Sequence, residues 1–191
     1  MNLPSYIFYD DCSSSSRLSE YGSSVSLTGS RVSTLTYNSS NNAYYFNRST
    51  NGDSFTGFKL PITATDNVKI SLKTKLSTNT AYCQFGIWMS ESSSKFEFIR
   101  IRGDKVLDGI KNSTNSQIFN ETNVATFNSD YYILEISYNG DNRVINVYDS
   151  SNTLIKTKTI TTQTYSNPVF YIAQNNNATG CYIKEIKVEA L

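Results

Sequence analysis

Apolar and polar residues alternate along most of this chain, which is the pattern of β-strands with one buried face and one solvated face. Between residues 67 and 77, Val68, Ile70 and Leu72 occupy every second position, and lysine or serine residues lie between them. We interpret these lysines as the exposed face of a half-buried strand, because charged side chains at alternate positions are normally solvated.

Similar alternation, or short apolar runs, predicts further strands in the second half of the chain. They lie at residues 81–89, 95–102, 131–138, 143–148, 153–160, 168–174 and 181–188. Turn residues separate them at 90–94, 102–104, 139–141, 149–152 and 175–180. The RGD triplet at 102–104 is interpreted as one of these turns, not as an integrin-binding motif.

The first third of the chain is less regular. Residues 13–56 predict two or three strands among long loops, with one turn of helix near 17–21, and residues 111–123 are also irregular. Short strands with frequent turns predict an all-β protein, an antiparallel β-sandwich or barrel. We expect a single domain over residues 1–191, with residues 1–5 as a flexible or linking segment.

Composition limits the kinds of molecule that this protein is expected to bind. Charged residues make up 17% of the 191 residues and the formal net charge is +1, so no strong field attracts nucleic acid. There is no apolar run of about 20 residues, so membrane insertion is not expected. Aromatic residues reach 13%, with 14 Tyr. This combination indicates a β-rich protein with an uncharged polar surface.

Cysteine and metal chemistry are sparse. With 3 Cys and no His, neither a disulfide framework nor a zinc site is expected. Cys83 is interpreted as a small buried hydrophobe. Cys12 and Cys181 could form a disulfide if the terminal strands are neighbours, and spacing alone leaves this open.

No cofactor is expected, although calcium remains open. Four aspartates near turns could contribute oxygen ligands: Asp10, Asp11, Asp141 and Asp149. However, the sequence around Asn139 lacks the order of a dedicated calcium loop. Asn139-Gly140 is better explained as a hairpin turn in which one residue needs a positive φ.

The order of these elements resembles the concanavalin A-like lectin/glucanase superfamily, including laminin-G-like domains. The residues that carry the resemblance are an acidic pair after the first strand, a late strand–turn–strand–turn–strand unit over 131–160, and a closing strand with Ile183, Ile186 and Val188. The resemblance implies a jelly roll whose last strand pairs near the first. The change in spacing after Ile183 requires a bulge near Glu185.

Some members of that superfamily are glycoside hydrolases, which need two carboxyl groups at a set distance. The carboxylate motif of the laminarinase-like branch is absent here, and only Glu97 and Glu135 remain as a pair that could meet across a sheet. The absence of His excludes Ser-His-Asp and Cys-His catalysis. We therefore expect no enzyme activity, with a divergent glycoside hydrolase as the least favoured alternative.

Strand parity predicts where a ligand would bind. If the parity of Cys83 faces the core, Tyr82, Gln84 and Trp88 face outward, and the same argument places Arg100 and Arg102 outward on the next strand. Aromatic rings beside amides and guanidinium groups suit sugar recognition. The alternative is that the parity is reversed and Trp88, the only Trp, lies in the core.

Together these features predict a non-catalytic binding module that recognises a glycan or a cell-surface component. The resemblance implies an extracellular, cell-surface or virion location, as in adhesins and phage tail or receptor-binding proteins. A homo-oligomer or a larger parent polypeptide is compatible with this role. The alternative is a structural or assembly domain of a virion or surface protein that binds no small ligand.

Overall fold

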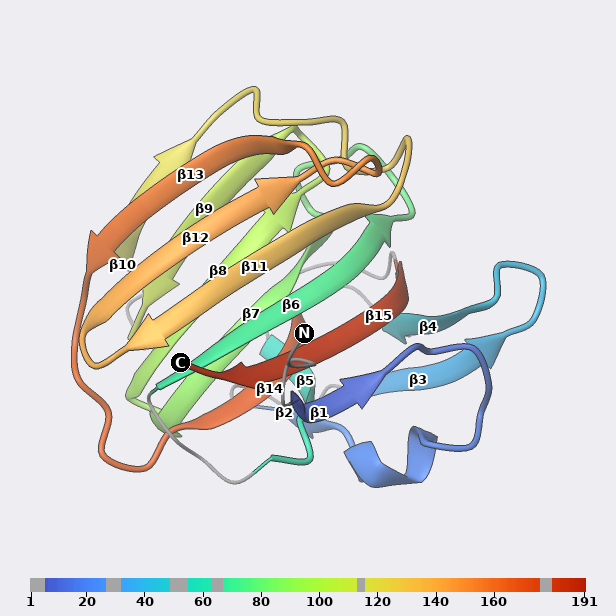
Figure 1. Cartoon of the computed structure of the whole chain (residues 1–191), viewed down its shortest axis with the longest axis horizontal. Coiled ribbons are helices and arrows are strands. Elements are labelled where there is room, and N and C mark those ends of the chain that lie inside the picture. The colour runs from blue at the N-terminus through green and yellow to red at the C-terminus, as the bar shows by residue number, and fades with distance from the viewer. Residues whose placement is uncertain (1–5, 27–31, 49–54, 63–66, 113–115, 176–179) are drawn as a thin grey trace, which may run out of the picture.

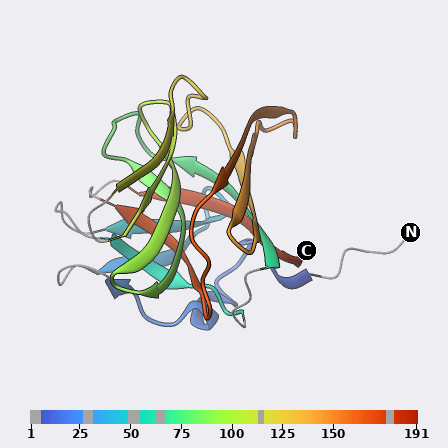
Figure 2. The ribbon, with the colours of Figure 1, turned by 90° about the vertical axis from the view of Figure 1, so that its left-hand side faces the viewer.

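The computed structural model describes residues 6–26, 32–48, 55–62, 67–112, 116–175 and 180–191. Two antiparallel β-sheets pack face to face, so the fold is a β-sandwich (Figure 1). From the side, the green strands of residues 84–111 lie in one layer, and the orange strands of residues 142–161 lie in the other (Figure 2). The predicted segment 1–5 lies outside the described residues, and no helix among the described residues is long and apolar enough to cross a membrane.

The first sheet has eight strands and contains both the first and the last strand of the chain. Its order is β13 (Leu154–Thr161), β12 (Asn142–Tyr148), β11 (Tyr132–Asn139), β6 (Asn67–Leu76), β15 (Cys181–Ala190), β4 (Ala43–Arg48) and β3 (Ser33–Asn38), with β1 (Tyr6–Asp10) also paired to β15. The predicted pairing of the terminal strands is therefore confirmed. The predicted bulge is confirmed too, because the β15–β6 register shifts between Ile183 and Glu185.

The second sheet has seven strands. Its order is β10 (Ser116–Glu121), β9 (Val106–Lys111), β8 (Lys95–Arg102), β7 (Gln84–Ser92), β14 (Val169–Asn175), β5 (Phe55–Lys59) and β2 (Val25–Ser26). A 3-10 helix, Leu18–Tyr21, lies where one turn of helix was predicted. Strand β9 was missed, and the expectation that residues 111–123 are irregular is wrong because β10 lies within them.

Alternate residues of both sheets fill the space between them, as the pattern predicted. Val68, Ile70 and Leu72 of β6 meet Phe85 and Ile87 of β7 in one core cluster. Cys12, Cys83 and Cys181 are all buried and free, so the disulfide left open between Cys12 and Cys181 is absent. The core is held by apolar burial and not by a covalent link.

Tight turns behave as their residues indicate. Strands β11 and β12 pair from Ile133 to Asn139 around Gly140, which has φ +60°. The hairpin interpretation of Asn139-Gly140 is therefore confirmed. In the next turn, Asp149 accepts hydrogen bonds from the backbone N–H groups of Ser151 and Thr153, and Asn152 takes the positive φ.

One side of the sandwich is closed by ion pairs. Strands β10 and β13 are the edge strands on this side, and Glu121 of β10 accepts from Lys156 at 2.7 Å and from Lys158 at 2.8 Å. Hydrogen bonds from Lys156 and Lys158 lower the pKa of Glu121 to about 2. The carboxylate therefore stays ionised at any physiological pH.

Gly86 allows β7 and β8 to approach closely. A Cβ at this position would lie 2.0 Å from the Ile99 carbonyl oxygen and 2.7 Å from the Arg100 Cα, both backbone atoms. We expect Gly86→Ala to lower the free energy of unfolding by at least about 1–3 kcal/mol, because the strands must separate. Chemical denaturation measures this. Thr159→Ala, on exposed β13, is the control, and equal stability of Gly86→Ala and wild type would contradict the packing described.

Candidate functional site

The predicted ligand-binding residues lie on the outer face of the seven-stranded sheet, the face turned away from the core. Phe85, Ile87, Ile99 and Ile101 belong to the core, so their neighbours Gln84, Trp88, Arg100 and Arg102 point outward. The reversed parity considered for Trp88 is thus ruled out. Strand register arranges this face in three adjacent rows that run across the strands.

The first row is aromatic and contains Trp88. Tyr171, Trp88, Phe98 and Ile110 are register partners on β14, β7, β8 and β9. The Tyr171 ring stacks on Trp88 with centroids 4.5 Å apart. Trp88 is only 1% exposed, so the expectation that it offers a free ring to a sugar is wrong. Its side chain has the predicted direction, but it belongs to a second apolar cluster on the outer face.

Phe55 completes this outer cluster from a more distant strand. Its ring lies 5.4 Å from Phe96 and 5.7 Å from Phe98, although Phe55 belongs to β5 and both partners belong to β8. Strands β14 and β7 lie between them, so the Phe55 side chain reaches across the sheet. This is why the neighbouring aromatic residues are buried despite facing away from the main core.

The second row consists of small residues that lead to a charged pair. Gly57, Ala173 and Gly86 are register partners, followed by Arg100 and Asp108. Arg100 Nε lies 2.7 Å from Asp108 Oδ1, and Arg100 Nη2 lies 3.1 Å from Oδ2. This bidentate ion pair is almost fully buried. It holds the guanidinium plane in one orientation above the sheet.

The third row carries Gln84 and Arg102, and it extends the charged network towards solvent. Arg102 contacts Asp108 at 3.0 Å and Asp104 at 2.7 Å. Burial lowers the pKa of Arg102, but the hydrogen bonds to Asp104 and Asp108 raise it more, so the net pKa is raised. The RGD triplet is a turn, as interpreted, and its Arg and Asp bind each other.

Three polar atoms of this face are buried and have no hydrogen-bond partner among the residues that the structure describes. They are Gln84 Oε1, Trp88 Nε1 and Arg100 Nη1, and each residue is less than a tenth exposed. Buried polar atoms are normally paired, so unpaired ones need an explanation such as a missing ligand or water. All three atoms are shielded from solvent, so a ligand on the outer surface does not reach them in this conformation.

Tyr82 supplies the exposed part of the candidate site. It precedes β7 in a turn, and it is 64% exposed. The backbone N–H of Gly103 donates to the Cys83 carbonyl at 2.9 Å, which holds this turn against the end of β8 that carries Arg102. An accessible aromatic ring therefore lies at the end of the face where Arg102 and Asp104 reach solvent.

The two glutamates considered for hydrolysis do not form a catalytic pair. Glu97 is fully buried in the sandwich, where it binds Arg143, whereas Glu135 lies on β11 between core residues and faces outward. Glu97 points from one sheet into the interior and Glu135 points from the other sheet to the exterior, so the two carboxyl groups cannot flank one glycosidic bond. The weakly favoured Glu97–Glu135 hypothesis is therefore wrong.

The aspartates considered for calcium are engaged elsewhere or dispersed. Asp10 is buried and accepts hydrogen bonds from the Tyr21 hydroxyl at 2.7 Å and the Tyr44 hydroxyl at 3.0 Å. Asp11 is exposed and binds Ser13. Within the described ranges, no group of three or more Cys, Asp or Glu residues is placed to hold a metal ion.

Sequence reasoning missed Asp108, Phe55 and Tyr171, which complete this face. Asp108 shares its parity with Val106 and Ile110, but this strand was not predicted, so the parity argument used for β7 and β8 was not applied to it. Nothing in the local sequence indicates that Phe55 reaches across two strands. Its contribution depends on the order of strands in the sheet.

Comparisons with known proteins establish the fold. No protein-family model matches the sequence, and no curated protein matches it. Among solved structures, a protein of unknown function with a galectin-like fold from Bacillus subtilis superposes with a TM-score of 0.70 and 6% identity, covering 100% of this chain and 98% of that one. This chain therefore has a concanavalin A-like, galectin-like jelly-roll fold, as the resemblance implied.

Two further structures share the fold and have glycan-related names. The carbohydrate-binding module CBM66 from Bacillus subtilis has a TM-score of 0.59 and 12% identity, covering 88% of this chain and 96% of that one. The exoplasmic/lumenal domain of VIP36, in a Ca²⁺/Man3GlcNAc-bound form, has a TM-score of 0.62 and 11% identity, covering 90% and 86%. At these identities the likeness concerns the fold alone.

Proposed function

We propose that this protein is a non-catalytic glycan-binding module displayed outside the cell or on a virion, in the manner of an adhesin or a phage receptor-binding protein. The observation that carries the proposal is the exposed Tyr82 ring at the end of the sheet face where the Arg102 and Asp104 side chains, 21% and 33% exposed, reach solvent. Sugar hydroxyls both donate and accept hydrogen bonds, and sugar ring faces pack on aromatic side chains.

One fold hosts many activities, so the fold supports this function and the assignment rests on the site. Structural matches include a carbohydrate-binding module and a glycan-bound lectin domain. They also include the GH43 BlXynB protein from Bacillus licheniformis, with a TM-score of 0.59 and 10% identity, but this chain covers only 33% of that one. The separation of Glu97 from Glu135 further favours binding over hydrolysis.

Binding is tested with a glycan array, followed by titration of the best ligand. Aromatic contacts contribute about 0.5–1.5 kcal/mol, so we expect Tyr82→Ala to weaken binding about 2- to 12-fold. Tyr82→Phe retains the ring and is expected to bind nearly as well as wild type. Absence of glycan binding, or equal affinity of Tyr82→Ala and wild type, would overturn this assignment.

A further inference from the structure

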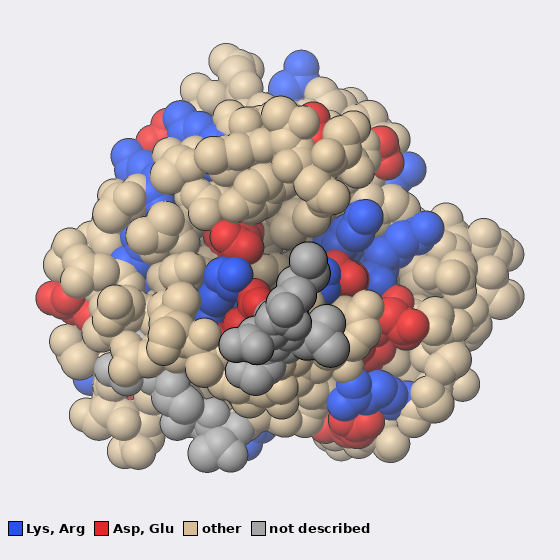
Figure 3. Space-filling view, in the orientation of Figure 1, with Lys and Arg blue, Asp and Glu red and all other residues tan. Residues whose placement is uncertain are grey.

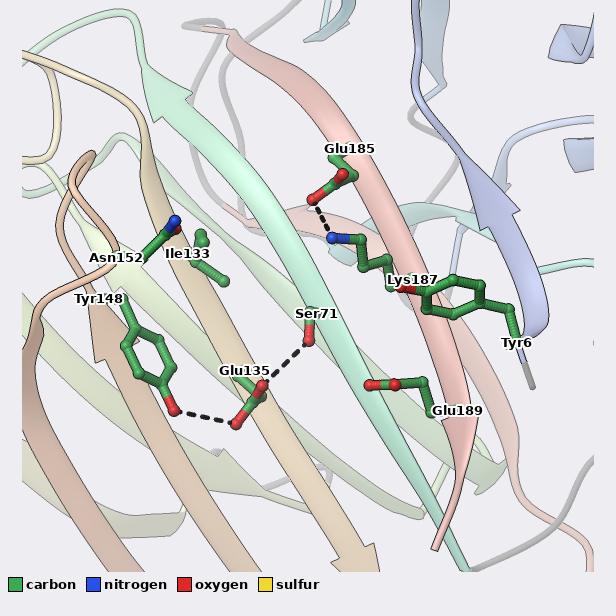
Figure 4. Close-up of a pocket in the computed structure, with 9 residues that line it drawn as sticks. All are labelled: Tyr6, Ser71, Ile133, Glu135, Tyr148, Asn152, Glu185, Lys187 and Glu189. Atoms are coloured by element: carbon green, nitrogen blue, oxygen red, sulfur yellow. Dashed lines mark hydrogen bonds and ion pairs between the residues drawn. The ribbon is translucent and has the colours of Figure 1, made fainter. Parts of the chain in front are cut away.

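The outer face of the eight-stranded sheet contains a hollow, on the side of the sandwich opposite Tyr82 and Arg100. Its volume is about 250 Å³. Side chains from β11 and β12 line one wall, side chains from β15 and β1 line the other, and Ser71 of β6 lies between them (Figure 4). Acidic and basic side chains gather near the middle of this face (Figure 3).

Two lysines form ion pairs with three glutamates around this hollow. Lys187 binds Glu185 at 2.8 Å, and Lys69 binds Glu189 at 2.8 Å. Lys69 lies 3.9 Å from Glu135, at the limit of an ion pair. The hydrogen bond to Glu189 and the charge of Glu135 raise the pKa of Lys69. Lys73 is the register partner of both Glu185 and Ile133 and adds a third ammonium group to this face, so the charges balance overall. Among the three carboxylates, Glu135 is the least neutralised, because its nearest lysine is the most distant.

Neutral groups hold Glu135 in place. Its carboxylate accepts from Asn146 Nδ2 at 3.1 Å, the Tyr148 hydroxyl at 3.3 Å and the Ser71 hydroxyl at 3.4 Å. These donors orient the carboxylate without cancelling its charge. Burial, followed by the charge of Glu135, raises the pKa of Tyr148, so the phenol keeps its proton and remains a donor.

The walls of the hollow are apolar enough to contact a ring. Tyr148 and Ile133 lie on one side, and Tyr6 lies on the other, where its ring stacks on Tyr9 with centroids 5.3 Å apart (Figure 4). A cavity of this volume lies just below the range of about 300–1,000 Å³ that is typical of drug-sized ligands. It therefore suits a compact ligand such as one sugar ring.

From this arrangement we propose that the hollow binds an amino sugar, with the ligand ammonium on Glu135 and the sugar ring between Tyr6 and Tyr148. The position of Lys69 shows that an ammonium group fits against the carboxylates of this face. An acidic sugar would meet the like charge of Glu135, and a neutral sugar would leave this carboxylate with only the distant Lys69 as a counter-charge. The module would then have ligand sites on both outer faces.

The probe for this site is glucosamine, compared with N-acetylglucosamine, in which the ammonium is replaced by an uncharged amide. We expect saturable binding of glucosamine by NMR titration, with shifts in residues of β11 and β15. We expect binding of N-acetylglucosamine to be at least tenfold weaker. Equal binding of both sugars, or no saturable binding of glucosamine, would overturn the proposal.

Variants distinguish binding at this hollow from binding at the sheet face beside Tyr82. Glu135→Gln keeps the shape but removes the charge, and we expect it to weaken glucosamine binding at least fivefold. Glu91→Gln removes a charge from an ion pair with Lys95 elsewhere and is the matched control. Tyr82→Ala is expected to leave glucosamine binding unchanged, so failure of the first site and failure of this one give different results.

Stability is monitored alongside binding. If Glu135→Gln lowers the unfolding temperature, Tyr6→Ala provides a second test, because Tyr6 is 41% exposed and its ring contacts the ligand in the proposed complex. We expect Tyr6→Ala to weaken glucosamine binding as well. Wild-type affinity in a folded Glu135→Gln or Tyr6→Ala variant would contradict the assignment.

Discussion

Replacing Glu97 with Gln is expected to lower the free energy of unfolding by about 3–5 kcal/mol, because the change leaves the Arg143 guanidinium buried without a counter-charge. Glu97 is 0% exposed and Arg143 is 1% exposed, and Arg143 Nε lies 2.5 Å from Glu97 Oε1. The second carboxylate oxygen accepts from the Thr162 hydroxyl at 2.8 Å. Urea denaturation followed by circular dichroism measures the change.

A double variant shows whether this loss comes from the unpaired charge. Glu97→Leu combined with Arg143→Met removes both charges, and apolar replacement of a buried ion pair is often neutral or stabilising. We therefore expect the double variant to be more stable than Glu97→Gln. Arg143 also donates to the carbonyl groups of Gly140 and Gln163, so some loss remains. A Glu97→Gln protein as stable as wild type would show that the pair is not buried as described.

Trp88→Ala is also expected to cost about 3–5 kcal/mol of unfolding free energy, the range for a fully buried large aromatic side chain. The lost contacts include the stacked Tyr171 ring and the edge contact with Phe96, whose centroids lie 4.5 and 6.2 Å from the Trp88 ring. Circular dichroism during thermal unfolding measures the loss, since the only Trp fluorophore is removed.

Tyr82→Ala is the comparison for Trp88→Ala. Because Tyr82 is 64% exposed, we expect its removal to change stability by less than about 0.5 kcal/mol. A small effect of Trp88→Ala would indicate that Trp88 is accessible and would restore it as a candidate sugar platform. If the large effect is found, lost binding in Trp88→Ala would report unfolding, so Tyr82 is the better position for testing recognition.

Much of the fold could be predicted because its central strands have one solvated face. In β6 every second residue from Val68 to Leu76 is buried, and the same holds in β11 from Leu134 to Tyr138. Asn139-Gly140 indicates the hairpin after β11 directly. Strand β9 was missed because Asp108 and Gly109 interrupt its apolar residues, yet Asp108 is buried by pairing with Arg100 of β8. The Arg100 partner that makes burial of Asp108 possible belongs to a neighbouring strand, so it cannot be inferred from the sequence of β9 alone.

The sequence predicted the sheet face to which the candidate side chains point, but it did not predict how deeply they are buried. Parity places Gln84, Trp88 and Arg100 on the outer face, because it depends only on the backbone pleat. Exposure depends on what distant segments place over that face, and the Phe55 ring reaches Trp88 from two strands away. The hollow around Glu135 was missed for a related reason: β6, β11 and β15 become neighbours only through the order of strands.

The ion pairs between Glu121 and the lysines of β13 also affect how molecules meet one another. An exposed edge strand can recruit a strand from another copy, and inward-pointing charges are one way in which proteins prevent this. Lys156 and Lys158 point towards the opposite sheet at such an edge. A strand added beside β13 would compete with these ion pairs and shield the lysines from water. Many copies of the protein can therefore be present at high local concentration without pairing their edge strands into aggregates.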